Sequence, residues 1–296
     1  MLQYLGQHFL KNKIKLQKIV EALDLKEGDA VIEIGPGHGE LTEELIDKFK
    51  SLNPPAGGEK FRIIAIEKDK KFAENLKEKF KIDKNIDPVR SKTSKMSADL
   101  LKINRTSNGV EIIEGDALKV LPQIIQDCKL QTTNYKLVGN IPYYITGYLF
   151  RILGELKKKP SKIILLIQKE VAQRLCAPKY GQKMNLLALA TQFYADLKIL
   201  FYVLKGDFTP APKVDSAVIE IIPRMILPKT DQKIFLKICR AGFSRKRKLL
   251  TSNLADNLKL PKEKIEKALE SIGVNLKSRA EDLLINDWEN LVLVLE

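Results

Sequence analysis

The tetrapeptide Asn140-Ile141-Pro142-Tyr143 carries groups that could hold a nucleobase for a reaction. It follows the apolar run 136–138, and open α/β sheets bind their ligands at the carboxyl ends of such strands. The lone pair of the adenine amine is delocalised into the ring, so an enzyme must orient this amine with hydrogen-bond acceptors. We expect the side-chain oxygen of Asn140 and a carbonyl beside Pro142 to accept the two N6 hydrogens, while Tyr143 stacks on the purine. The alternative is an ordinary strand-end Asn before a Pro turn.

A glycine-rich turn upstream is typical of a nucleotide-like ligand. The segment DAVIEIGPGHG (29–39) runs from an apolar stretch into Gly35 and Gly37, which allow a ligand to approach the backbone closely. Glu67 closes the next apolar run and could accept both ribose hydroxyls, and Asp116 could accept a hydrogen bond from an adenine amine. Taken singly, each acid is better explained as a helix N-cap or a solvated loop residue, and it is their order after the glycine turn that favours a ligand.

The spacing of these groups leaves two cofactors open. A dinucleotide site expects G-x-G-x-x-G with an acid about 20 residues further on, whereas here the turn reads G-P-G-H-G and Glu67 follows Gly35 by 32 residues. The PPAGG loop at 54–58 could account for the excess. The tetrapeptide at 140–143 favours S-adenosylmethionine over a dinucleotide, because it predicts methylation of an amine. His8 and His38 are the only histidines, so we expect direct displacement without a histidine triad, a histidine relay or a bound metal.

Alternating apolar and amphipathic segments must position these groups. Strands are predicted at 30–34, 62–66, 110–113, 136–138 and 162–167, with helices at 40–49, 69–80 and 146–156. Two further strands at 198–204 and 215–222 are expected to end the sheet as an antiparallel hairpin. The predicted fold class is therefore α/β, a Rossmann-like methyltransferase domain over 1–223, with a flexible insertion at 87–109. Helical segments at 231–243, 261–271 and 279–295 predict a small all-helical domain over 224–296.

The overall charge indicates a polyanionic partner. The 296 residues carry 51 Lys and Arg against 37 Asp and Glu, a net charge of +14, which favours nucleic acid over an anionic membrane. The chain has no apolar run long enough to span a bilayer and no signal-peptide pattern at its start, and its three scattered cysteines suggest no disulfide framework. We expect a cytoplasmic monomer without a metal.

A basic cluster in the helical domain is the expected RNA-binding surface. It contains six cations and no acid within its span: Lys237, Arg240, Arg245, Lys246, Arg247 and Lys248. Cations of this kind contact phosphates and position an RNA rather than read its sequence. We expect FSRKRK (243–248) to be helical, and the alternative role for the cluster is a solvated helix face.

In the order of its motifs the chain resembles the ribosomal RNA adenine dimethyltransferase family over nearly its whole length, apart from 87–109. The matching blocks are GQHFL (6–10), EIGPGHGELT (33–42), GNIPYYIT (139–146), QKEVAQRL (168–175), FTPAPKVDSAV (208–218) and FSRKRK (243–248). The resemblance implies that His8 and Leu10 cover the cofactor together with Gly35, Glu67, Asp116 and Asn140. It also implies that Phe208 faces Tyr143 across the target base. Many relatives have Asn at the position of His8.

The family resemblance also frames the substrate. One branch methylates two adjacent adenosines in the hairpin near the 3′ end of 16S rRNA, in the small ribosomal subunit, and contributes to ribosome biogenesis. The FTPAPKVDSAV and FSRKRK blocks look like this branch. The alternatives are a large-subunit 23S rRNA methyltransferase of the macrolide-resistance type and a ribosome-assembly factor that binds RNA without catalysis. DNA adenine methyltransferases are less similar, because Ile141 departs from their pattern.

Overall fold

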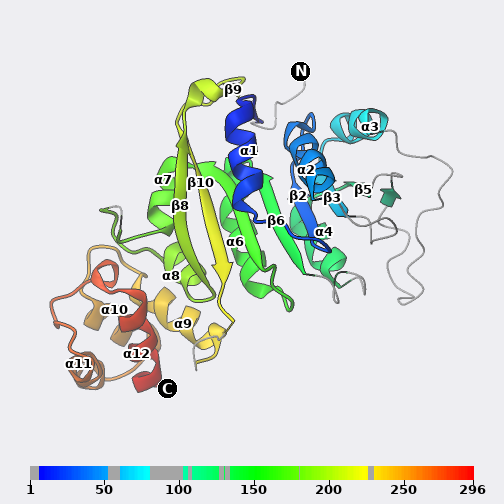
Figure 1. The fold of residues 1–296 in the computed structure, drawn as a ribbon. Coiled ribbons are helices and arrows are strands. Elements are labelled where there is room, and N and C mark those ends of the chain that lie inside the picture. The colour runs from blue at the N-terminus through cyan, green and yellow to red at the C-terminus, as the bar shows by residue number, and fades with distance from the viewer. Residues whose placement is uncertain are drawn as a thin grey trace. The chain divides into compact units, whose positions relative to one another are not determined.

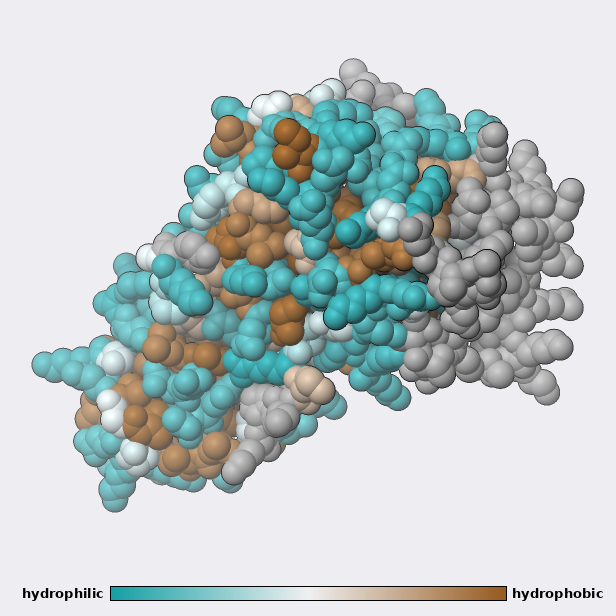
Figure 2. Space-filling view, in the orientation of Figure 1, coloured by the Kyte–Doolittle hydropathy of each residue, from teal (hydrophilic) through white to brown (hydrophobic). Residues whose placement is uncertain are grey.

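The computed structural model describes residues 7–52, 61–80, 103–105, 109–126, 130, 134–179, 181–225 and 230–296. The chain forms two compact units. The first comprises Met1–Lys169 and Ile199–Ile222, and the second comprises Glu170–Lys198 and Pro223–Glu296. None of the helices in the described part of the chain is long and apolar enough to cross a membrane. Polar residues cover much of the surface in view, with smaller hydrophobic patches between them (Figure 2).

Within the described residues, a mixed sheet of eight strands forms the framework of the first unit (Figure 1). Its order is β4-β5-β3-β2-β6-β7-β10-β8. The bounds are β2 Ala30–Ile34, β3 Arg62–Glu67, β4 Ile103–Arg105, β5 Val110–Glu114, β6 Tyr135–Asn140, β7 Lys162–Gln168, β8 Ala195–Val203 and β10 Ser216–Pro223. The five central strands are parallel, while β10 pairs antiparallel with β7 and β4 pairs antiparallel with β5. The strands predicted from apolar runs are thus confirmed.

The short strand β4 lies inside the segment that we expected to be a flexible insertion. Ile103–Arg105 pair antiparallel with β5, and the flexibility of the segment stays a prediction. The rest of 87–109, except Gly109, lies outside the described residues.

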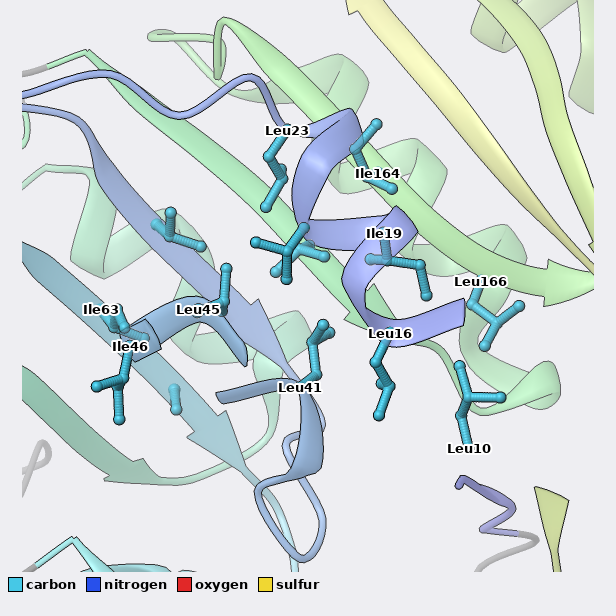
Figure 3. Packing of buried hydrophobic residues seen from close by; sticks show 14 of the residues in the cluster. Leu10, Leu16, Ile19, Leu23, Leu41, Leu45, Ile46, Ile63, Ile164 and Leu166 are labelled. Carbon is cyan, nitrogen blue, oxygen red and sulfur yellow. The ribbon is translucent and has the colours of Figure 1, made fainter. Parts of the chain in front are cut away.

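Helices cover the sheet of the first unit because they bury apolar stripes against it. They are α1 Lys13–Ala22, α2 Glu40–Ser51, α3 Lys70–Lys79, α4 Ala117–Ile125 and α6 Thr146–Glu155. Figure 3 shows how Leu16 and Ile19 of α1 lie among Leu41 and Leu45 of α2 and Leu166 of β7. Helix α1 was not predicted from the sequence. Its N-cap Asn12 accepts a hydrogen bond from the amide of Lys15.

A two-stranded sheet joins the N-terminal segment to the FTPAP block. Strand β1 (Phe9–Leu10) pairs antiparallel with β9 (Phe208–Thr209), which follows the short helix η2 (Lys205–Asp207). Leu10 lies opposite Phe208, and both are buried in the core of the first unit. This pairing places the segment containing His8 beside the carboxyl ends of the parallel strands.

The second unit is helical. Its helices are α8 Leu186–Gln192, α9 Gln232–Gly242, α10 Leu250–Leu258, α11 Lys262–Ser271 and α12 Ile285–Leu295, with η3 at Ala280–Asp282 and most of α7 (Lys169–Leu175). Segment 170–198, which we expected in the first domain, belongs to this unit. The reason is its packing, since the Phe193 ring contacts that of Phe235 at a centroid distance of 4.5 Å and Arg224 donates its amide to the carbonyl of Tyr194.

The FSRKRK segment is not a helix, contrary to our expectation. Residues 243–248 form an irregular turn between α9 and α10, which we call the basic turn. Helix α9 ends at Gly242, and the Phe243 amide makes the last helical hydrogen bond, to the carbonyl of Cys239. Helix α10, which was not predicted from the sequence, begins at Leu250.

Candidate active site

A pocket opens where β2, β3 and β6 end, at the edge of the sheet predicted from the motifs. It is lined by Gln7, His8, Phe9, Gly35, Gly37, Glu67, Asn140, Ile141, Pro142 and Tyr143. These residues come from three strand ends and from the N-terminal segment. Of the residues predicted to act on the cofactor or the base, the structure brings together His8, Gly35, Gly37, Glu67, Asn140, Pro142 and Tyr143.

The glycine turn requires glycine at its centre. Gly37 adopts a φ of +58°, and a Cβ there would lie 2.5 Å from a ring carbon of Phe9. Helix α2 follows with Gly39 as its N-cap, and no side chain caps it. Helix N-terminal amides without a side-chain cap favour an anionic ligand group. The turn therefore presents backbone donors beside the pocket.

The carboxyl group of Glu67 reaches across this turn. One oxygen accepts from the Gly37 amide at 3.1 Å, and the other accepts from the Asp69 amide at 2.8 Å. Burial raises the pKa of Glu67 above its usual range, while these backbone hydrogen bonds act to lower it. Each oxygen retains capacity for a further hydrogen bond, such as one from a sugar hydroxyl.

Asn140 connects strand β6 to the N-terminal segment. Its Nδ2 donates to the carbonyl oxygen of His8 at 2.7 Å. The ring Nδ1 of His8 in turn donates to the carbonyl oxygen of Pro210 at 2.8 Å. With its amide nitrogen engaged in this way, Asn140 keeps Oδ1 as an acceptor without a protein partner among the described residues. The strand end therefore offers the acceptor that holding an amine requires.

The ring of Tyr143 is held at the pocket from its phenol end. The hydroxyl lies 3.0 Å from Oγ of Ser216, and the ring centroid lies 6.0 Å from that of His8. Burial raises the pKa of Tyr143, so the phenol stays neutral near pH 7. The ring can serve as a stacking surface but is not a base.

Three predicted site residues lie outside this pocket. Phe208 is buried opposite Leu10 and does not line the pocket, and Leu10 lines a second hollow behind the glycine turn. Asp116 caps helix α4 by accepting from the Leu118 amide, the alternative considered for a single acid. Nζ of Lys68 lies 3.0 Å from Oδ2 of Asp116. Burial acts to raise the pKa of Asp116. The hydrogen bonds that it accepts from Lys68 and from the Leu118 amide, together with the charge of Lys68, lower the pKa below its ordinary value.

Sequence reasoning missed the aromatic group that covers the turn. The rings of Phe9 and His38 pack edge to face with their centroids 4.2 Å apart, and the centroids of His38 and Phe72 are 4.8 Å apart. Phe9 belongs to the GQHFL block and His38 to the glycine motif, but nothing in their spacing indicates that they touch.

Glu33, inside the same motif, was also missed. It is 1% exposed and lines the hollow behind the glycine turn. The Thr42 hydroxyl donates to Oε2 of Glu33 at 2.7 Å. Burial raises the pKa of Glu33 to about 8, with the Thr42 hydrogen bond acting to lower it.

The pKa of Glu33 predicts a pH-dependent stability. Between the ordinary value of 4.5 and about 8, the folded protein keeps a proton that the unfolded chain has lost. The free energy of unfolding therefore decreases as pH rises through this window, by roughly 1 kcal/mol per pH unit. Glu33→Gln, which mimics the protonated acid, should gain stability relative to wild type between pH 5 and pH 8. Urea denaturation at both pH values measures this, and the exposed Glu270→Gln is the control; a pH-independent difference for Glu33→Gln would contradict it.

The six predicted RNA-binding cations are all exposed in the second unit. No acid lies between Lys237 and Lys248 in the sequence, but helix α10 supplies one. Oδ2 of Asp256 lies 3.4 Å from Arg245 and 3.6 Å from Lys248. The described residues contain no group of three His, Cys, Asp or Glu side chains arranged to hold a metal ion.

Comparison with known proteins identifies the family. The family model described as "Ribosomal RNA adenine dimethylase" matches residues 3–296. The chain belongs to this family. It is 38% identical to the ribosomal RNA small subunit methyltransferase A of Dehalococcoides mccartyi strain CBDB1 over 291 residues, covering 98% of this chain and 86% of that protein. It is 33% identical to the protein of the same name from Mycoplasma capricolum subsp. capricolum, covering 98% and 95%.

A solved structure shows the same fold. The dimethyladenosine transferase from Plasmodium falciparum superposes with a TM-score of 0.70 at 24% identity, covering 97% of this chain and 96% of that one. These matches confirm the predicted family, the α/β fold with its C-terminal helices, and methyl transfer from S-adenosylmethionine to adenine in ribosomal RNA. The pocket fits this cofactor, since it combines the backbone donors of the glycine turn with the acceptor oxygens of Glu67.

Proposed function

We propose that this protein dimethylates N6 of two adjacent adenosines in the 3′-terminal hairpin of 16S rRNA, within the small ribosomal subunit, during ribosome biogenesis. The observation that carries the chemistry is Asn140, whose amide nitrogen is engaged by the His8 carbonyl so that Oδ1 remains an acceptor at the pocket. The identity of 38% to a relative named for the small subunit supports the choice of subunit.

Cofactor binding is assigned to the glycine turn and the strand ends around it. Gly35 and Gly37 offer backbone contacts, Glu67 accepts the ribose hydroxyls, and His8 lies over the pocket from the N-terminal segment. Leu10 supports that segment from the core, and Asp116 would accept from the adenine amine beside its ion pair with Lys68. The cofactor supplies an electrophilic methyl group on its sulfonium.

The chain's own residues act by orienting the target amine. Oδ1 of Asn140 and a backbone carbonyl at Pro142 accept the two N6 hydrogens, which turns the nitrogen lone pair out of conjugation and toward the cofactor. Tyr143 stacks on the purine, with its hydroxyl tied to Ser216. After the first transfer the amine loses a proton to water, and the remaining N–H is held for the second. A contact of Phe208 with the target base stays a prediction.

We assign RNA docking to the helical domain at 224–296, through Lys237, Arg240 and the cations of the basic turn. Their exposure to solvent supports this role. Arg245→Glu with Arg247→Glu should weaken binding to the small subunit at least about tenfold and reduce its salt dependence, because phosphate contacts release counter-ions. Filter binding at several salt concentrations measures both quantities. Cofactor affinity should stay unchanged, and an RNA affinity equal to that of wild type would contradict the assignment.

The substrate assignment is tested by offering the choice directly. Unmethylated small and large subunits are incubated separately with the protein and S-adenosylmethionine, and N6,N6-dimethyladenosine is measured by mass spectrometry. We expect the product only in small subunits, at two adjacent adenosines. Product confined to large subunits would favour the 23S rRNA alternative. We further propose that the protein acts in the cytoplasm as a monomer without a metal, which light scattering and activity in the presence of EDTA test.

A further inference from the structure

The basic turn holds four consecutive cations, Arg245 to Lys248, in a defined backbone conformation. A run of like charges in an exposed loop repels itself and ordinarily favours many conformations. Here the second unit contacts the turn from two sides, through α10 and through α12.

Helix α10 holds the turn with one buried amide. Asn253 is 1% exposed, and its Nδ2 donates to the carbonyl oxygens of Gly242 at 2.7 Å and Arg245 at 3.0 Å. Its Oδ1 accepts from the hydroxyl of Ser244 at 3.2 Å. The Gly242 carbonyl is at the C-terminal end of α9, where carbonyls have no partner within the helix. One side chain therefore caps α9 and fixes the first half of the turn.

A second amide and a ring complete this frame. Asn257, one helical turn further along α10, donates to Oγ of Ser244 at 2.8 Å. Helix α12 contributes Trp288, which is fully buried and stacks on the Phe243 ring at a centroid distance of 5.7 Å. A Cβ at Gly242 would lie 2.4 Å from the Trp288 ring, so the beginning of the turn packs directly against it.

Among the described residues, only two of the four cations of the basic turn lie near an acidic side chain. Asp256 lies near Arg245 and Lys248, at the two ends of the run. Lys246 and Arg247, between them, have no ion-pair partner in the described part of the chain. The contacts of α10 and α12 therefore fix the first residues of the basic turn, and the turn presents two cations, Lys246 and Arg247, without an acidic partner in the region that the structure describes.

We propose that Asn253 is a positioning residue for RNA docking, holding the basic turn in a preformed shape that matches the phosphates of a folded RNA. The inference rests on the proposed role of the basic turn in RNA binding. A preformed turn loses less conformational entropy on binding than a flexible one, so it favours a partner whose phosphates are also fixed in space. An unstructured strand can adapt to any arrangement of the same charges, because counter-ion release depends on how many phosphates are contacted.

The test compares a folded partner with an unstructured one. Binding of the full chain to unmethylated small subunits and to polyuridylate is measured across a range of salt concentrations. Asn253→Ala should lose about tenfold in affinity for the subunit and less than about twofold for polyuridylate, with the slope of log affinity against log salt unchanged. Unchanged affinity for the subunit, or an equal loss for both partners, overturns the proposal.

Two further variants separate this result from misfolding and from failure of the proposed function. Ser244→Ala removes the contacts of both amides with an exposed serine and keeps all charges, so it should reproduce the selective loss in a smaller degree. If thermal unfolding shows that Asn253→Ala does not fold, the result for Ser244→Ala decides whether the turn must be held for RNA docking. Arg247→Glu should weaken binding to both partners and reduce the salt slope by about one. If Arg247→Glu has no effect, the basic turn does not bind RNA and the proposed function fails at this point, whatever Asn253→Ala does.

Discussion

Asn140→Ala should lower the turnover of small-subunit methylation by about 10²–10³-fold, the range seen when one preorganised hydrogen-bonding group is removed from a reaction centre. The variant loses Oδ1, the acceptor assigned to the target amine, and also the hydrogen bond from Nδ2 to the His8 carbonyl. Single-turnover transfer of labelled methyl groups measures the change. Circular dichroism checks the fold, and Asn275→Ala, at an exposed position in the second unit, serves as a control.

Asn140→Asp separates the two interactions that Asn140→Ala removes together. The carboxylate keeps an oxygen in place of Oδ1 but presents no N–H to the His8 carbonyl. If the acceptor matters most, Asn140→Asp should retain more turnover than Asn140→Ala while its KM for the cofactor rises. Equal turnover in the two variants would assign the effect to the His8 contact. Wild-type turnover in Asn140→Ala would remove the proposed mechanism.

Glu67→Ala should weaken S-adenosylmethionine binding by about 10–100-fold, because a hydrogen bond to a charged group contributes about 1.5–3 kcal/mol. Glu67 lines the pocket and keeps free acceptor capacity after bonding the Gly37 and Asp69 amides. Isothermal titration calorimetry gives the dissociation constant directly. Affinity for small subunits, measured without cofactor, should be unchanged.

Asp116→Asn is the matched comparison for Glu67→Ala. Asn caps helices as well as Asp does, so α4 should keep its N-terminus. Asp116 is already paired with Lys68 and does not line the pocket, so we expect a smaller loss of cofactor affinity than in Glu67→Ala. A larger loss in Asp116→Asn would show that the adenine end of the cofactor dominates binding and that the weight given to Glu67 is wrong.

The sequence alone was sufficient to predict the framework of the first unit. Strands buried on both faces appear as short runs of Ile and Val, and β2, β3, β5, β6 and β7 could be located for that reason. The glycine turn and Asn140 could be placed because they directly follow such runs, and parallel strands bring their carboxyl ends to one edge. Helix α1 was not recognised, although Leu16, Ile19 and Val20 have helical spacing.

Contacts between distant segments could not be predicted from local pattern. The hydrogen bond from Asn140 to the His8 carbonyl joins positions that are 132 residues apart in the sequence. The burial of Phe208 depends on its pairing with Leu10. The charge of the FSRKRK segment was plain from the sequence, but its conformation was not, because a run of Arg and Lys suits a helix as well as a turn. Tertiary contacts set this conformation, since Asn253 and Trp288 come from later helices and hold the chain where α9 ends. Residues that directly follow a buried strand could thus be assigned to the pocket from the sequence, whereas packing between segments far apart in the chain sets how those residues and the basic turn are held.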